Sequence, residues 1–177
     1  MLNDNNMLKI FSNDYKVTGK HSTMLSELVQ NNFFEYYWQI CMVAPLVGFF
    51  YQHKGQIDKN NDIKPSTIFL NQLTPRYEDF DFIYRLILLA DEHYCESAQE
   101  RIDKAFRTIY QENTQDDEKI FQEYLLGGVE KLYEKLVLDD TKSDDSDISL
   151  PQNFRNLGNF IEEIKINNVS DNSDKIF

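Results

Sequence analysis

Acidic side chains gather in one short segment, and they are the first candidates for chemistry. The segment holds five aspartates, Asp139, Asp140, Asp144, Asp145 and Asp147. Closely spaced carboxylates can bind a divalent metal ion, which would suit a small metal-dependent hydrolase or nuclease. The spacing does not fit an EF-hand loop, because no Gly stands at the sharp turn and no Glu closes the loop. We therefore interpret residues 139–153 as an acidic linker and keep the metal enzyme as an alternative.

Other residues of ligand type stand too close together in the chain to converge on one ion. Asp91, Glu92, His93 and Cys95 are near neighbours, and adjacent side chains on a helix point in different directions. The sequence also lacks a nucleophile elbow, a phosphate-binding loop, a dinucleotide fingerprint and an HExxH motif. We expect a protein that is not an enzyme and that has no catalytic residue, metal ion or cofactor.

A basic stripe is the remaining feature that could bind a ligand. Arg101, Lys104 and Arg107 recur every three residues. On a helix they would lie along one side, where they could dock an acidic partner surface. The alternative is a solvated face on which Glu100 and Asp103 alternate with them.

The net charge of −12 is distributed unevenly along the chain. Residues 112–177 contain 7 basic and 16 acidic side chains, a balance of −9. Such a surface repels nucleic-acid phosphate, so we expect no direct binding of DNA or RNA. An acidic inhibitor that mimics DNA is an alternative function.

The composition favours one helical domain. The 177 residues are 41% hydrophobic, and they include 6 Gly and 4 Pro. This length can bury a core, and the scarcity of Gly and Pro argues against a turn-rich β-sandwich. We predict an all-α, single-domain orthogonal bundle of five to seven helices over residues 21–138, preceded by a loosely ordered segment, residues 1–20. Because the first twenty residues lack a hydrophobic leader and Cys41 and Cys95 form no motif, we expect a cytoplasmic protein.

The central helix of this bundle should come from an apolar run, residues 33–51, in which only Glu35 is charged. A helix that is apolar all round is either buried or covered by another protein. A membrane span fits less well, because Gln39 and Pro45 lie within the run and no basic cluster flanks it. Pro45 should kink or restart the helix, which should end near Gly55.

Capping signals and apolar periodicity place the other helices. Ser22 or Thr23 can begin a short helix, and a helical turn is expected over residues 65–70. Thr74-Pro75 and Ser97–Glu100 are start signals. The longer helices are predicted over residues 75–93, 98–112 and 115–138, with Phe80, Ile83, Tyr84, Ile87 and Leu88 inward on the first and Ile102, Phe106 and Ile109 inward on the second.

Two adjacent glycines interrupt the apolar stripe of the 115–138 helix. Each Gly costs about 1 kcal/mol relative to Ala in a helix interior, so Gly127 and Gly128 need a structural reason. We predict a close contact between helices there, with Ala44 and Gly48 on the opposite side.

A last amphipathic helix is expected over residues 154–166, followed by a frayed tail, residues 167–177. Its apolar side chains are Phe154, Leu157, Phe160 and Ile161. The helix could dock into a groove of a partner, or it could fold back and close the bundle.

Two segments resemble a known group of proteins. One is Phe33 to Phe50, centred on Met42-Val-Ala-Pro-Leu-Val-Gly48. The other, Ile120 to Leu132, is similar to the F-x-E-Y-x-x-G-G-x-x-x-L helix of small proteins encoded beside bacterial DNA-phosphorothioation and other phage-defence genes, called Dnd-system-associated proteins. The two segments cover about 31 residues. This chain differs from the group by Pro45, where a small apolar residue is more frequent, and by its acidic C-terminal extension.

The resemblance implies an accessory subunit of a prokaryotic defence system, and it transfers no active residue. Together with the absence of a catalytic motif, it leads us to expect a non-catalytic adaptor. Its partner would be a larger nucleic-acid-processing protein encoded nearby.

Overall fold

The protein is an all-α bundle with one small sheet, as the composition predicts. The computed structural model describes residues 11–60, 62–107, 115–138 and 151–173, with the side chains of the last helix described to residue 167. The elements in order are β1 (Tyr15–Val17), α1 (Gly19–Gln30), α2 (Tyr37–Phe50), β2 (Ser66–Ile68), α3 (Leu70–Leu73), a 3-10 turn (Thr74–Arg76), α4 (Tyr77–Ala90), α5 (Ala98–Phe106), α6 (Gln115–Tyr133), a π-helical turn (Glu134–Leu138) and α7 (Gln152–Ser173).

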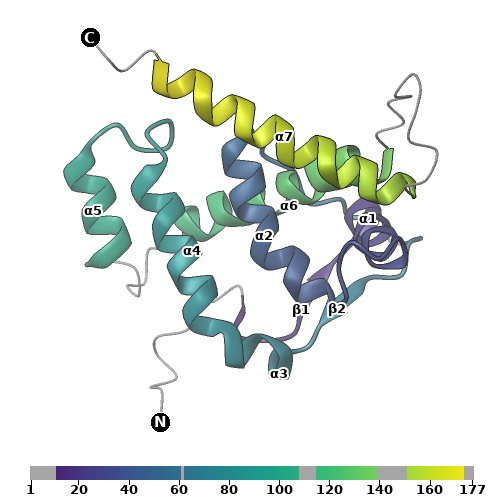
Figure 1. The fold of residues 1–177 in the computed structure, drawn as a ribbon. Coiled ribbons are helices and arrows are strands. Elements are labelled where there is room, and N and C mark those ends of the chain that lie inside the picture. Colours follow the sequence, from purple (N-terminus) through teal and green to yellow (C-terminus); the bar gives the residue numbers. More distant parts are fainter. Residues whose placement is uncertain (1–10, 61, 108–114, 139–150, 174–177) are drawn as a thin grey trace.

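Helix α2 occupies the centre of the bundle. It lies between α4 and the long helix α7, with α6 behind it, and α5 stands at one end of the molecule (Figure 1). The largest fully buried side chains include Tyr84, Tyr124, Phe11, Phe80 and Phe121. At about 1.5 Å per residue, the 14 residues of α2 extend about 21 Å, less than the ~30 Å hydrocarbon core of a bilayer. Within the described residues, no helix is long and apolar enough to cross a membrane.

The contact between α2 and α6 has no room for side chains. A Cβ atom on Gly48 would overlap the Tyr124 carbonyl oxygen, and one on Gly128 would overlap the carbonyl oxygen of Ala44. The predicted contact is therefore present, with the two helix backbones touching. A Cβ on Gly127 would instead overlap the carbonyl oxygen of His53, just beyond α2.

Helix α2 is shorter than predicted, and Pro45 does not restart it. The helix begins at Tyr37, after the extended residue Tyr36, whose N–H donates to Gln39 Oε1 at 2.9 Å. It ends at Phe50, shortly before Gln52 at φ 50°. Pro45 lies buried inside the continuous helix. Gly55, the predicted end, serves another purpose: its N–H donates to the carbonyl of Glu123 on α6 at 2.8 Å.

The expectation of a loosely ordered N-terminal segment needs correction for residues 11–20. Phe11 is buried in the core, and β1 pairs antiparallel with β2, with Tyr15 opposite Ile68. The turn expected over residues 65–70 is therefore a strand from Ser66 to Ile68. Residues 1–10 lie outside the described part.

Helix α1 begins at Gly19, earlier than the predicted caps Ser22 and Thr23. Gly19 has φ 58°, a conformation that glycine adopts without strain. The Asp58 carboxylate accepts the Lys20 N–H at 2.7 Å and so caps the first turn from 38 residues away.

Helix α5 follows its start signal at Ser97, whereas α4 begins at Tyr77 and ends at Ala90, within the predicted 75–93. Thr74 and Pro75 lie in the preceding 3-10 turn, where Thr74 Oγ1 donates to the carbonyl of Leu70 at 2.9 Å and does not cap α4. Helix α5 turns a different face inward from the one predicted. The five residues predicted inward on α4 are all buried, and Ser97 Oγ accepts the Glu100 N–H at 3.4 Å. On α5, however, Ile102 and Phe106 are exposed and Arg101 is buried. The prediction for those two side chains is wrong because the polar contacts of Arg101 orient the helix. Ile109 lies outside the described residues.

The C-terminal helix folds back onto the bundle. It runs from Gln152 to Ser173, longer than the predicted 154–166 and into the expected tail. Asn156 is buried and donates to the carbonyl of Leu136 at 2.8 Å. Tyr51 of the segment after α2 donates to Glu163 at 2.9 Å. The segment 139–150 lies outside the described residues.

The contact between α2 and α6 predicts opposite effects for two glycine-to-alanine changes in helices. Gly128→Ala should destabilise by about 1–3 kcal/mol or more, because its Cβ meets the backbone at Ala44. Gly158→Ala in α7 is the matched control. A Cβ there meets nothing within 4 Å, so the change should stabilise by up to about 1 kcal/mol. Chemical denaturation of both variants measures the difference, and equal stabilities would contradict the contact.

Candidate functional site

The residues with metal-ligand chemistry serve structural roles. Asp91 is buried, and its carboxylate accepts the N–H groups of His93 and Tyr94, each at 3.1 Å, and the hydroxyl of Tyr124 at 2.8 Å. It thus fixes the turn after α4 against α6. Among the described residues, no group of three or more His, Cys, Asp or Glu side chains could hold a metal ion. The aspartates of residues 139–150 lie outside the described part.

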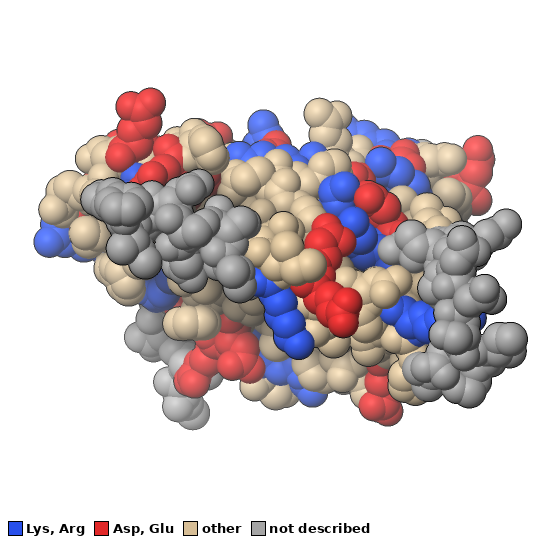
Figure 2. Space-filling model, turned by 45° about the horizontal axis from the view of Figure 1, so that its top comes forward, with Lys and Arg blue, Asp and Glu red and all other residues tan. Residues whose placement is uncertain are grey.

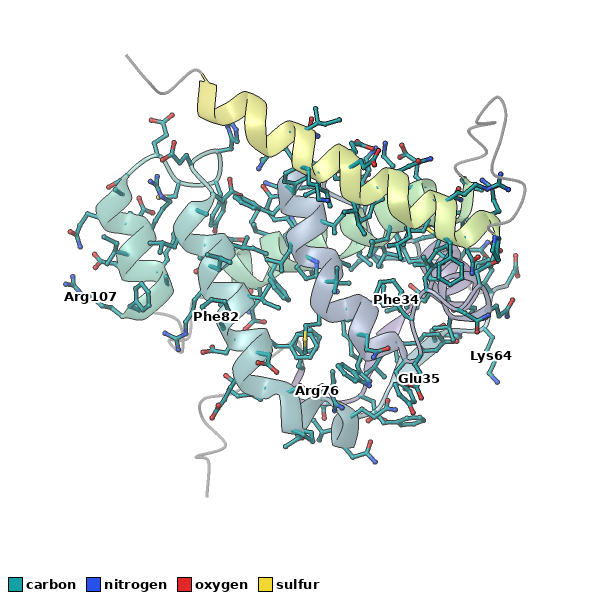
Figure 3. All side chains as sticks on the ribbon, viewed as in Figure 1. Phe34, Glu35, Lys64, Arg76, Phe82 and Arg107 are labelled. Atoms are coloured by element: carbon teal, nitrogen blue, oxygen red, sulfur yellow. The ribbon has the colours of Figure 1, made fainter. Side chains whose placement is uncertain are left out.

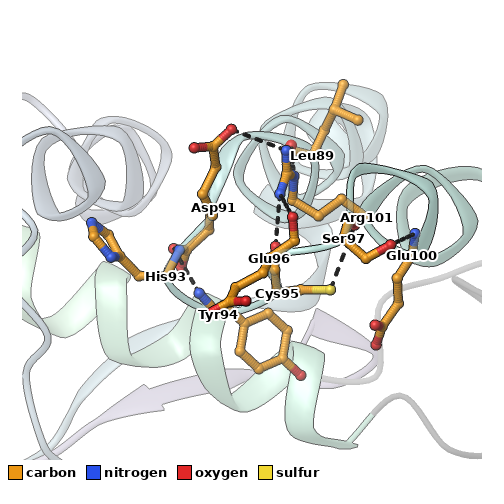
Figure 4. Close-up of polar contacts among 10 residues, drawn as sticks. Leu89, Asp91, His93, Tyr94, Cys95, Glu96, Ser97, Glu100 and Arg101 are labelled. Atoms are coloured by element: carbon orange, nitrogen blue, oxygen red, sulfur yellow. Dashed lines mark hydrogen bonds and ion pairs between the residues drawn. The ribbon is translucent and has the colours of Figure 1, made fainter.

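The predicted basic stripe is not a free surface, because Arg101 is buried. Its guanidinium donates to the carbonyls of Leu89 at 2.9 Å, Cys95 at 2.7 Å and Glu96 at 2.9 Å, and to the Glu92 carboxylate at 3.1 Å (Figure 4). One side chain therefore satisfies carbonyls at the end of α4 and in the following loop. Arg101 holds α5 in place and cannot dock a partner.

The other two members of the stripe also have partners within the chain. Lys104 contacts Asp117 on α6 at 2.8 Å, and the same carboxylate accepts the Tyr94 hydroxyl at 2.7 Å. Arg107 pairs with Asp103 at 2.6 Å and is exposed. The structure therefore does not bring the three basic side chains together into one docking site.

An apolar groove lies beside α7, and it contains three of the four predicted docking residues. We call it the α7 groove. Its volume is about 280 Å³, and its apolar lining is Phe33, Phe34, Val43, Leu132, Leu136, Phe154, Leu157 and Phe160, with Asn32 and Asn153 beside them. Phe34 lies below α7, between α2 and α1 (Figure 3). Phe160 is 8% exposed and belongs to the core, whereas Phe154 is 60% exposed. Ile161 is exposed but does not line the groove.

The groove continues onto an exposed stripe of α2. Val43 lines the groove, and Leu46 and Phe50 follow at i+3 and i+7 on the same side of the helix. The three side chains are 37–39% exposed. The apolar run is thus covered on its α6 side, while its opposite side keeps apolar groups in contact with solvent.

A cluster of charged and imidazole groups was missed by the sequence reasoning. The carboxylate of Glu130 on α6 binds Lys20 Nζ at 2.8 Å, His21 Nε2 at 2.8 Å and His53 Nε2 at 2.7 Å. These partners come from α1 and from the segment after α2, more than 70 residues away in sequence. No local pattern in the sequence indicates this cluster.

Two members of the cluster, Glu130 and His21, have shifted pKa values. Burial would raise the pKa of Glu130, but hydrogen bonds from Lys20, His53 and His21 lower it to about 2. Glu130 is therefore ionised, and both rings donate their Nε2–H to it. Burial lowers the pKa of His21, partly offset by Glu130. The other ring nitrogen of His21, Nδ1, is buried and has no hydrogen-bond partner in the described part of the chain.

Comparison with known proteins gives no relative from which a function could be transferred: no family model, curated protein or solved structure matches this chain. The chain's own surface is therefore the basis for inferring a function.

The contacts of Arg101 predict a large effect on stability. Arg101→Leu should destabilise by about 2–4 kcal/mol, because three carbonyls lose a donor. Arg107→Leu, which breaks one exposed ion pair, should change stability by less than about 0.5 kcal/mol. Urea unfolding of the two variants provides the comparison. If both variants were equally stable, Arg101 would not hold α5.

The Glu130 cluster predicts a loss of stability in mild acid. His21 has a lower pKa in the folded chain than its ordinary 6.5, so the unfolded chain binds a proton first as the pH falls. Stability contributed by His21 should therefore decrease as the pH falls below about 6.5. Glu130 should add a second decrease below about pH 4.5, since its folded pKa is about 2.

Thermal unfolding between about pH 7.5 and about pH 5 tests the contribution of His21. His21→Gln should reduce the dependence on pH, because the amide can still donate to Glu130 and does not titrate in this range. His93 is exposed, so His93→Gln serves as the matched control and should behave like the wild type. An unchanged pH profile in His21→Gln would contradict this role.

Proposed function

We propose that this chain is a non-catalytic protein-binding subunit, an adaptor, whose docking surface is the α7 groove together with the exposed stripe of α2. One observation carries the proposal. Helix α2 contains no charged residue, yet Val43, Leu46 and Phe50 remain exposed. Contiguous exposed apolar surface is typical of a binding site for another protein.

The shape of this surface suits a helix of the partner. The groove is lined by apolar side chains from several elements, and α7 forms one wall. A partner helix with apolar residues at i, i+3, i+4 and i+7 could insert one large side chain into the 280 Å³ groove and lay the next ones along α2. The partner we propose therefore presents an amphipathic helix.

Charge favours a basic rim on that helix. The chain carries a net charge of −12, so a partner with Lys and Arg around its apolar face would associate faster and with better discrimination. On the face shown in Figure 2, acidic and basic residues are interspersed with uncharged surface. That distribution supports the adaptor more than the alternative of an inhibitor that mimics DNA, which needs an extended row of carboxylates.

The identity of the partner is a further part of the proposal. The resemblance of residues 33–50 and 120–132 to Dnd-system-associated proteins suggests a larger nucleic-acid-processing subunit of a prokaryotic defence system, encoded nearby. Among the described residues, we find no arrangement of side chains that would support a separate catalytic activity of this chain. The metal-dependent alternative depends on the aspartates between residues 139 and 150, which lie outside the described part.

Two substitutions on α7 test the docking surface. Phe154 lines the groove and is 60% exposed, whereas Ile166 lies outside the groove and is 68% exposed. Phe154→Asp should abolish co-purification of the tagged chain with products of its neighbouring genes, because a desolvated carboxylate opposes docking. Ile166→Asp should retain it. Equal melting temperatures of the two variants would exclude misfolding.

Two results would contradict the adaptor. One is a chain that repeatedly purifies alone as a monomer when expressed with its neighbouring genes. The other is a partner that remains bound to Phe154→Asp with wild-type affinity, which would place docking on a different surface.

A further inference from the structure

A second cavity lies where the connection between α1 and α2 meets β2 and α3. Its volume is about 260 Å³, and its lining includes three aromatic side chains, Tyr36, Tyr37 and Phe69. Glu35 and Gln72 contribute the polar part of the lining. Glu35 stands at the edge of the molecule, on the same side as Arg76 (Figure 3). The cavity does not share any lining residue with the α7 groove.

The aromatic rings of this cavity are unusually open to solvent. Phe69 is 54% exposed and Tyr36 is 45% exposed. Tyr36 stacks on Trp38 with ring centroids 6.2 Å apart, and Arg76 places its guanidinium 3.5 Å from the Trp38 centroid. The cluster therefore already holds one cation on an aromatic face, next to the cavity.

The chemistry of the lining favours a cation that donates no hydrogen bonds. A primary ammonium has three N–H groups that need acceptors when it loses water. Here Gln72 Oε1 already accepts the N–H of Phe69 at 3.2 Å, and the Glu35 carboxylate accepts the hydroxyl of Tyr36. A quaternary ammonium needs no acceptor, and it is attracted by aromatic rings and by a nearby carboxylate.

We propose that the cavity formed by Glu35, Tyr36, Tyr37 and Phe69 binds a quaternary ammonium group, such as the trimethylammonium of a small choline-like molecule. The cavity volume of about 260 Å³ has room for a trimethylammonium group, and a cation within ~6 Å of a ring centroid makes a cation–π contact. The carboxylate of Glu35 in the lining attracts the cation and disfavours a phosphate attached to it. The site should therefore prefer a free trimethylammonium compound to a phosphocholine headgroup.

The single Trp of the chain provides the signal for a test, because Trp38 stacks on Tyr36. Choline chloride, titrated at constant ionic strength, should change the Trp38 fluorescence to saturation. The uncharged isostere 3,3-dimethylbutan-1-ol should bind at least about tenfold more weakly. Vesicles of phosphatidylcholine should give no saturable change. A saturable response to vesicles but not to choline would overturn the proposal in favour of a lipid surface.

Variants of the lining provide the controls. Tyr36→Ala and Phe69→Ala should each weaken choline binding about fivefold, and Glu35→Gln should weaken it about threefold. Phe106→Ala removes an equally exposed ring on α5 and should leave affinity unchanged. Choline methyl resonances in saturation-transfer NMR give a second readout that does not depend on Trp38. Absence of saturable binding in folded protein, or equal binding of the uncharged isostere, would refute the site.

Discussion

The contact between the backbones of α2 and α6 is the constraint on which the rest of the structure depends. Ala44 and Gly48 on one helix meet Tyr124 and Gly128 on the other at a distance that no Cβ permits at the two glycines. Such proximity replaces side-chain packing by many contacts between main-chain atoms. It also fixes which side of α2 is inward, because the small residues must face α6.

The orientation of α2 determines what the protein can offer to a partner. Once Ala44 and Gly48 face α6, the large apolar residues Val43, Leu46 and Phe50 must lie on the other side of the helix. These three side chains remain 37–39% exposed. The open apolar surface is thus a consequence of the tight contact behind it, and the proposed docking function uses this surface.

Three groups of polar contacts attach the outer elements to that centre. Arg101 joins α5 to the end of α4, Asp91 joins the same turn to α6, and Glu130 joins α6 to α1 and to the segment after α2. In each group, a charged side chain is largely shielded from water and has several hydrogen-bonding partners. Removing that side chain would therefore cost stability. These polar contacts, and not apolar packing alone, connect the outer elements. Charged residues of the types found in catalytic sites therefore have structural roles here.

The sequence predicted those features that depend on neighbours along the chain. The periodicity of α4, the Ser97 cap of α5, and the need of Gly127 and Gly128 for a close neighbour all follow from local physical chemistry, and the structure contains them. The failures involve distant partners. Asp58 caps α1 from 38 residues away, β2 forms because β1 pairs with it, and α5 turns Arg101 inward to reach carbonyls on α4. Phe154 and Leu157 were candidates for docking because of their apolar type, but the groove that they line could be recognised only from the fold.

Hydrogen–deuterium exchange of the full chain tests the central claim most directly. If the contact between α2 and α6 organises the structure, the amides of Ala44, of residues 46–48 and of residues 124–128 should exchange together and most slowly, at the rate set by global unfolding. Helices α5 and α7, which are attached from outside, should exchange faster through local opening. Faster exchange in α2 than in α5 or α7 would contradict the account, because the bundle would then be held together elsewhere.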